Sequence, residues 1–216
     1  MRNAAVTCHP KAQWTAVAVA AVLWFLMFSP WTAPLLPFWW CMTASACILS
    51  TLALTQGGSA CLGSFDGAPL WKQLIAGVLI AAALWLVFFI GDKVSQWMFS
   101  FARPQVNLIY DMKDGSSPLL LSLLMLCVIG PAEEVFWRGY VQRSLTARLS
   151  PTWAFVLTTA IYALVHLPSG NFMLIMAALT CGIIWGGLYR LFPQWLPAII
   201  LSHALWDAAA FVWFPF

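Results

Sequence analysis

Two adjacent glutamates in an otherwise apolar stretch are the first residues of this chain that are suited to chemistry. Glu133 and Glu134 precede an arginine, Arg138, within the segment PAEEVFWRG. Burying an ionisable side chain in an apolar stretch costs free energy, so such side chains are either functional or closely paired. On a helix, Glu134 and Arg138 are i, i+4 neighbours that can form an ion pair, whereas Glu133 points about 100° away around the axis. The spacing predicts one neutralised glutamate and one free for chemistry, the alternative being a structural ion pair beside a protonated glutamate.

Two histidines and an aspartate occupy further apolar stretches. His203 and Asp207 are also i, i+4 neighbours, so the carboxyl group can orient the imidazole or bind the same ligand. A single histidine in a membrane helix more often bonds a neighbouring helix than catalyses a reaction. Here, however, His166, His203 and the two glutamates include every Glu and every His of the chain except His9. We therefore predict that these groups assemble one polar site inside the membrane.

The composition predicts that membrane-spanning helices position these residues. Of the 216 residues, 62% are hydrophobic and only 8% are charged. The apolar runs exceed the ~20 residues that a helix needs to cross a bilayer, and they recur along the chain. We expect an all-α, polytopic transmembrane helix bundle of about seven spans (six to eight), forming a single integral membrane domain over residues 1–216. The net charge of +3 is small and the basic residues are scattered, so we expect membrane lipid, and no nucleic acid, as a partner.

The expected spans are separated by turns that contain Pro, Gly or charged residues. They cover residues 13–29, 35–55, 70–91, 118–149, 152–167, 172–191 and 196–213. The polar residues 92–117 predict an extramembrane loop with an interfacial helix around residues 94–101. In the fourth span, Gly130 and Pro131 predict a kink just before Glu133, and residues 142–149 are expected at the membrane surface. The glycines of residues 182–187 predict close packing of the sixth span against a neighbour.

The spacing of the cysteines matches no metal-binding or redox motif. They are dispersed, mostly within apolar runs and without a Cys-x-x-Cys pair, so we expect inert buried thiols. Cys8 precedes the first apolar run and is therefore not expected to accept a lipid after a cleaved signal, which makes the first span a retained anchor. The six positions are Cys8, Cys41, Cys47, Cys61, Cys127 and Cys181.

Lysine and arginine predict the orientation of the bundle. More Lys and Arg residues lie in the short segments on one side of the membrane than in the loop after the third span. Because the more basic side faces inward, this difference favours an inside N-terminus and an outside C-terminus. The inner segments then hold Arg2, Lys11, Lys72, Arg143, Arg148 and Arg190, and the outer loop holds Lys93, Arg103 and Lys113. A rise of ~1.5 Å per residue would leave Glu133 and His166 ~13 Å apart along the membrane normal, unless residues 118–125 project outward. We predict that projection, which puts the site in the outer half of the membrane.

The three clusters, in this order, resemble the motifs of the CAAX protease and bacteriocin-processing (CPBP, or ABI) family of intramembrane proteases. The first motif is Glu133-Glu134-x-x-x-Arg138-Gly139, the second is an aromatic-x-x-x-His from Tyr162 to His166, and the third is His203-x-x-x-Asp207. The resemblance covers a catalytic half, residues 118–207, while the first three spans match only as generic hydrophobic helices. It implies an intramembrane endopeptidase acting on a membrane-associated substrate.

The resemblance also implies a role for each residue. Glu133 with His166 would activate a water, and His203 with Asp207 would stabilise the oxyanion. Glu134 with Arg138 would hold the site and the substrate. A carboxyl group in a dry site suits a general base that later serves as an acid. The family usually has Phe in place of Tyr162 and has Asn or Asp at position 207. An aspartate donates to an oxyanion only when protonated, and its other possible role is to fix the tautomer of His203.

The sequence alone does not decide whether the reaction requires a metal ion. Glu133, His166 and His203 could supply three zinc ligands of the His2Glu kind and leave a position for water. The chain lacks His-Glu-x-x-His, and the family has been described in both glutamic-protease and metalloprotease terms. We favour metal-independent glutamate chemistry with no cofactor and keep zinc as the alternative, because Glu133 is more useful as a base than as a ligand.

The competing class of function is a protein that is not an enzyme. An immunity-type peptide-binding membrane protein or a proton-coupled carrier can use the same buried polar groups. Carriers often show inverted repeats, whereas the polar residues here are confined to the second half. For an enzyme, the resemblance covers substrates with prenylated C-termini, peptide precursors and C-terminal sorting helices cleaved by a myxosortase-like branch. The small size suits a prokaryotic inner (plasma) membrane protein.

Overall fold

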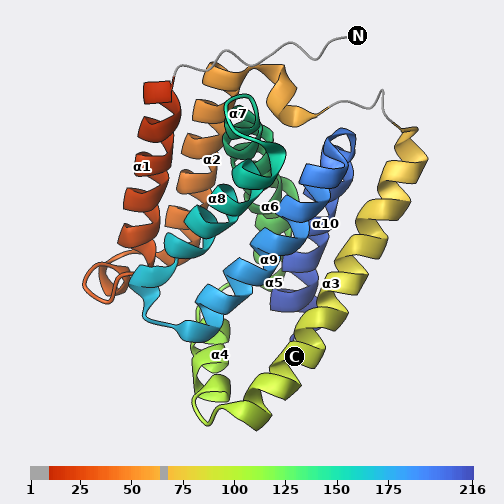
Figure 1. The fold of residues 1–216 in the computed structure, drawn as a ribbon. Helices are drawn as coiled ribbons and strands as arrows, with labels where there is room; N and C mark the ends of the chain where they lie inside the picture. Colours follow the sequence, from red (N-terminus) through yellow and green to blue (C-terminus); the bar gives the residue numbers. More distant parts are fainter. Residues whose placement is uncertain (1–9, 64–67) are drawn as a thin grey trace.

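The computed structural model describes residues 10–63 and 68–216, and in these residues all regular structure is helical. Helices α1 and α2 form one side of a bundle and α3 the other, with the helices that carry the polar motifs between them (Figure 1). The short helix α4 lies at the end of the bundle opposite the start of α1. The bounds are α1 Pro10–Phe28, α2 Phe38–Gly57, α3 Leu70–Met98, α4 Ala102–Asp111, α5 Pro118–Leu124, α6 Gly130–Glu134, α7 Arg143–Thr146, α8 Pro151–Leu164, α9 Phe172–Leu191 and α10 Leu196–Ala208.

Seven helical segments of the described chain are long and apolar enough to cross a membrane. The all-α polytopic fold is therefore as predicted, and the protein is an integral membrane protein. The sixth predicted span, residues 172–191, coincides with α9. Side chains on the outer face of α3, such as Leu74 and Leu79, are exposed, as expected for a surface that contacts lipid.

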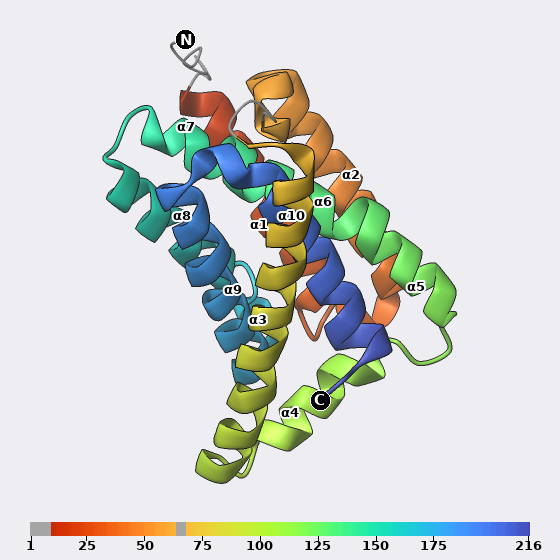
Figure 2. The ribbon, with the colours of Figure 1, turned by 90° about the vertical axis from the view of Figure 1, so that its right-hand side faces the viewer.

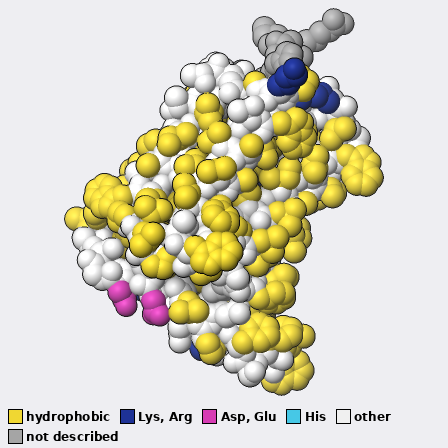
Figure 3. Space-filling view, turned by 90° about the vertical axis from the view of Figure 1, so that its left-hand side faces the viewer, with side chains coloured by type: hydrophobic (Ala, Val, Ile, Leu, Met, Phe, Trp, Pro, Cys, Tyr) yellow, Lys and Arg dark blue, Asp and Glu magenta, His cyan; other side chains and the backbone are white. Residues whose placement is uncertain are grey.

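The face shown in Figure 3 supports this arrangement. Hydrophobic side chains cover its middle, Lys and Arg lie near the start of α1, and acidic side chains, with a further Lys or Arg, lie toward the other end. An apolar belt between two polar ends is the surface that a bilayer requires.

The predicted interfacial helix was placed wrongly. Residues 94–98 continue α3, and the short helix outside the spans is α4, which crosses the end of the bundle (Figure 2). The cause is Asp92, which is buried and neutralised: its carboxylate accepts from Gln96 Nε2 at 2.5 Å and lies 3.2 Å from Lys93 Nζ and 3.4 Å from Arg103 Nη1. A paired charge does not end a helix, so α3 runs on to Met98.

The fourth span is one 29-residue helical segment, Pro118–Thr146, that contains two widened, π-helical stretches. The first, Met125–Ile129, lies directly before the predicted kink, and there the amide of Gly130 donates to the carbonyl of Met125. Pro131 has no N–H to donate, and a widened turn is a common way of accommodating such a break. The second stretch, Val135–Gln142, follows the two glutamates.

Gly130 brings this span against α10. A Cβ at Gly130 would lie only 2.7 Å from Ala204 Cα and 2.8 Å from Ala204 N, so a larger residue cannot be accommodated without moving a backbone. Because Ala204 is adjacent to His203, this close approach sets the first motif beside the third.

The segment predicted at the membrane surface, residues 142–149, is largely buried in the bundle at its start and exposed from residue 146 onward. Gln142 and Ser144 are almost completely buried, and Gln142 Nε2 donates to the carbonyl of Gly186 on α9 at 2.9 Å. Arg148 donates to Gln13 Oε1 on α1 at 2.7 Å. Gln142 and Arg148 thus link the segment to α9 and α1, whereas the buried Ser144 hydroxyl has no partner in the described residues.

The glycines of α9 pack closely against α8, as predicted. A Cβ at Gly182 would lie 3.0 Å from Thr159 Cγ2, and one at Gly186 would lie 3.1 Å from Phe155 Cδ2. Thr159 also donates its hydroxyl to the carbonyl of Gly182 at 3.1 Å. This contact fixes the position of α8, which carries Tyr162 toward its C-terminal end.

Five of the cysteines lie in the described residues, and no disulfide joins them. Cys61 and Cys181 are buried as expected, whereas Cys47 and Cys127 are exposed on the apolar surface. The expectations for Cys8 and for the basic residue Arg2 fall on residues 1–9, outside the described part of the chain.

Candidate active site

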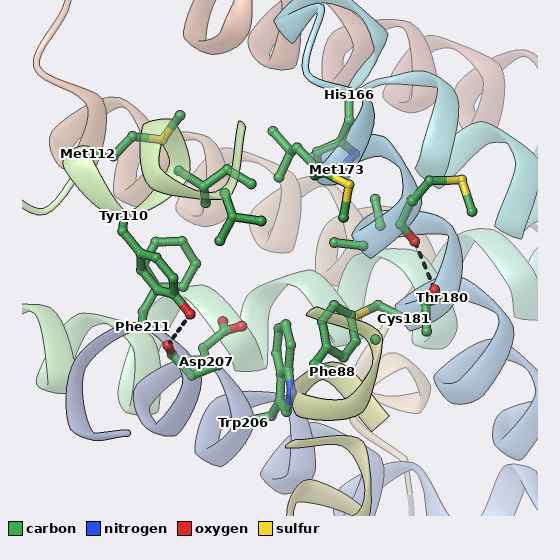
Figure 4. Close-up of a pocket in the computed structure, with 18 of the residues that line it drawn as sticks. Phe88, Tyr110, Met112, His166, Met173, Thr180, Cys181, Trp206, Asp207 and Phe211 are labelled. Atoms are coloured by element: carbon green, nitrogen blue, oxygen red, sulfur yellow. Dashed lines mark hydrogen bonds between the residues drawn. The ribbon is translucent and has the colours of Figure 1, made fainter. Parts of the chain in front are cut away.

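A cavity of about 510 Å³ lies in the half of the bundle nearest to α4. Most of its wall is aromatic, aliphatic or Met side chain, and five polar residues of the three motifs also line it: Glu133, Tyr162, His166, His203 and Asp207. Figure 4 shows His166 and Asp207 among the side chains around it, with Phe88, Met173 and Trp206. The three motifs, which are far apart in the sequence, thus meet at one apolar cavity.

The rim of the cavity joins α4 to residues 209–216. The Tyr110 hydroxyl donates to the carbonyl of Ala210 at 3.2 Å (Figure 4) and accepts from the amide of Phe216 at 3.2 Å. Burial raises the pKa of Tyr110, so its hydroxyl remains a donor at neutral pH. Arg103 donates to the carbonyl of Phe216 at 3.0 Å, which links this rim to Asp92.

Glu134 is the centre of a buried charge cluster. Its Oε1 accepts from Arg138 Nη1 at 2.8 Å, so the predicted i, i+4 ion pair is formed, and the same oxygen lies 2.7 Å from His203 Nδ1. All three side chains are almost completely buried. The Arg138 guanidinium also lies over the Tyr162 ring, 4.9 Å from its centroid, and over the Trp185 ring at 5.7 Å. The arginine is therefore held by a carboxylate and two aromatic faces.

His203 lies between two carboxylates, Glu134 at Nδ1 and Asp207 at Nε2. Nδ1 donates to Glu134, while Nε2 lies 3.5 Å from Asp207 Oδ1 at the cavity. Trp185 stacks on the imidazole with ring centroids 3.8 Å apart and planes 20° apart, and its indole N–H donates to Ser202 Oγ at 3.0 Å. Of the two roles considered for Asp207, fixing the His203 tautomer is thus already performed by Glu134.

One carboxylate oxygen of Glu133 is bonded by Tyr162, and the other has no partner among the described residues. Glu133 Oε2 accepts from the Tyr162 hydroxyl at 2.9 Å. No side chain or backbone group of the described chain bonds Oε1, and the residue lines the cavity. A carboxylate oxygen that faces a cavity and has no protein partner can hold a water.

His166 has both ring nitrogens engaged. Nδ1 lies 2.8 Å from the carbonyl of Tyr162 and donates to it, so Nε2 carries the lone pair and accepts from Trp24 Nε1 at 3.2 Å. The rings of Trp24, Phe28 and Tyr162 surround the imidazole. A water can therefore bond Nε2 only where the indole of Trp24 gives way.

The three residues of the alternative zinc site do not converge. His166 is occupied by Tyr162 and Trp24, and His203 Nδ1 is bonded to Glu134. In residues 10–63 and 68–216, no group of three His, Cys, Asp or Glu side chains is placed to hold a metal ion. These donors do not fit a zinc ion in this conformation.

Sequence reasoning missed two residues of the site. Trp24 comes from the first span and Trp185 from the sixth, and both are completely buried against a motif histidine. Among 14 tryptophans in an apolar chain, no spacing separates these two from those that face lipid. Tyr162 was identified as the aromatic residue of the second motif, but its bond to Glu133 had no signal in the sequence.

The fold and the site together define a class: a helical membrane protein in which one glutamate, two histidines and an aspartate line a largely apolar cavity. A buried pair of glutamate and arginine lies behind one of the histidines. Residues 115–209, which include all three motifs, match the family model described as type II CAAX prenyl endopeptidase Rce1-like. This match agrees with the CAAX protease (CPBP) family of intramembrane endopeptidases that the motifs predicted, over residues 115–209. No curated protein and no solved structure matches the chain.

Proposed function

We propose that this protein hydrolyses a peptide bond of a membrane-associated substrate, with Glu133 as the general base. The observation that carries the proposal is the state of the Glu133 carboxylate: Oε2 is held by Tyr162, and Oε1 has no partner in the described chain and borders an apolar cavity. A carboxylate held in this way can take a proton from a water at its unbonded oxygen.

In the first step Glu133 Oε1 accepts a proton from a water as the water oxygen bonds the scissile carbonyl carbon. The carbonyl π electrons move to its oxygen and form a tetrahedral oxyanion. In the second step the oxyanion collapses, the C–N bond breaks, and protonated Glu133 gives its proton to the leaving amine. His166 assists by accepting from the water at Nε2, which requires that Trp24 release that nitrogen.

His203 and Asp207 are the groups proposed to bind the oxyanion. With Nδ1 bonded to Glu134, a protonated His203 offers Nε2–H toward the cavity. Asp207 lies 3.5 Å from that nitrogen and serves as a second donor only in its protonated form. Donors fixed in advance at a developing negative charge are usually the largest single contribution to catalysis. Glu134 and Arg138 act through His203, because they hold its ring from the side away from the cavity.

The chemistry of the cavity wall supports an apolar substrate segment. Beyond the five motif residues, the wall is built mainly from side chains such as Phe28, Phe38, Phe88 and Trp206. Such a wall suits a lipidated peptide or a C-terminal sorting helix, with the scissile bond near the C-terminus or the membrane segment of the substrate. We propose a prokaryotic inner membrane as the location.

The substitution Glu133→Gln tests this function. It removes the base but retains the shape of the side chain and an acceptor for Tyr162, so we expect cleavage to be abolished while the protein remains folded. The readouts are thermal unfolding of the purified variant and mass spectrometry of peptides that accumulate in cells carrying it. Activity within about tenfold of the wild type would rule out Glu133 as the base.

A further inference from the structure

We propose that the hydroxyl of Tyr162 is a positioning group for the general base. In this role, which rests on the proposed function, the hydroxyl fixes Glu133 Oε2 so that Oε1 alone is presented to the water. A phenylalanine at this position could not form this bond, because it has no hydroxyl.

The geometry of Tyr162 suits it to this task. The side chain is 5% exposed, and its hydroxyl donates to Glu133 Oε2 at 2.9 Å. Its backbone carbonyl accepts from His166 Nδ1 at 2.8 Å. One residue of α8 therefore contacts both members of the proposed water-activating pair, the glutamate through its hydroxyl and the histidine through its carbonyl.

The phenol ring is itself immobilised. The Arg138 guanidinium lies over one face, 4.9 Å from the ring centroid, and the Trp137 ring meets it edge-on at 5.3 Å. Both neighbours come from the helix that carries Glu133. Because the ring is clamped by that helix, the hydroxyl has a fixed position relative to the carboxylate, and its hydrogen bond restricts rotation of the carboxylate plane.

This bond has two consequences for the reaction. The terminal torsion of a glutamate is broad, so without a partner its carboxylate plane samples many orientations. With Oε2 held, Oε1 is kept in the direction of the cavity, which favours proton transfer at that atom. A donor also stabilises the ionised form of a carboxylate, so the base remains active at lower pH than it would without the hydroxyl.

The test is Tyr162→Phe, which removes one oxygen and retains the aromatic ring. Hydrogen bonds to charged groups contribute about 1.5 to 3 kcal/mol, so the acidic limb of the kcat/KM against pH profile should move up by about one to two pH units. At neutral pH we expect kcat to fall about three- to tenfold, because the carboxylate is less well oriented, with KM unchanged.

Tyr140→Phe is the matched control. Tyr140 is also completely buried and bonds Gln56, but it does not line the cavity. Losing that hydroxyl should lower the unfolding temperature without moving the pH profile. If Tyr162→Phe is poorly folded, incorporation of 3-fluorotyrosine at position 162 keeps the ring and strengthens the donor. The acidic limb should then move down instead of up.

The outcomes separate this inference from the proposed function. If Glu133→Gln retains activity, the proposed function is wrong. If Glu133→Gln is inactive while Tyr162→Phe and the fluorotyrosine enzyme both keep the wild-type pH profile, the proposed function stands and the positioning role of Tyr162 is wrong.

Discussion

At the scale of the residue, Glu134 contacts one more charged or titratable side chain than its spacing in the sequence predicts. The i, i+4 rule predicted its pair with Arg138, but only the fold brings His203 Nδ1 to the same carboxylate oxygen. One buried carboxylate thus neutralises an arginine and orients a histidine. Contacts within a helix can be predicted from spacing, because helix geometry is fixed, whereas contacts between helices depend on packing that the sequence pattern does not specify.

Glu134→Ala and Arg138→Ala should each reduce the amount of folded protein as well as activity. Either change leaves a buried group without its partner, which typically costs about 3 to 5 kcal/mol. The double variant should recover part of the stability but no activity, because His203 remains without the acceptor at Nδ1. Thermal unfolding and cleavage assays on all three variants check this. Single variants as thermostable as the wild type would contradict a structural role for the pair.

At the scale of the element, most spans could be predicted, because length and hydropathy are properties of a single segment. The irregular features could not. The extension of α3 to Met98 depends on the partners of Asp92. The widened turn before the glutamates, where Pro131 predicted only a kink, also involves the close approach of Gly130 to α10. The contribution of α1 is the clearest case: only the structure brings Trp24 to His166.

Trp24→Phe tests whether the indole N–H from α1 only blocks Nε2 of His166 or is needed for activity. The change removes the indole N–H but keeps most of the ring, so we expect a stability loss of about 1 kcal/mol. Activity should stay within about threefold of the wild type or rise, because water can take the freed Nε2 of His166. Trp213→Phe is a control that removes an indole bond to Ser122 away from the cavity. Loss of activity in Trp24→Phe alone would mean that the reaction needs the indole donor.

At the scale of the whole molecule, the cavity lies toward one end of the bundle. Its wall includes residues from α4, from the end of α3, and from the turn between α8 and α9. The opposite end carries the start of α1, where Lys11 stands, and α7 with Arg143. The prediction that Glu133 and His166 approach each other agrees with their position at one cavity. If the more basic end faces inward, the cavity opens toward the outside.

Cysteine accessibility decides the orientation. In a background without the six native cysteines, single cysteines are introduced at Ser116 and Leu119, near the α4 end, and at Ala147, near the other. Leu119 and Ala147 are both exposed in the structure, so a difference in labelling between them reports the side of the membrane and not burial. We expect an impermeant thiol reagent to label positions 116 and 119 in intact cells and to reach 147 only after permeabilisation. Labelling of 147 in intact cells, with 116 and 119 protected, would instead place the cavity on the cytoplasmic side, where a substrate lipidated in the cytoplasm could reach it directly.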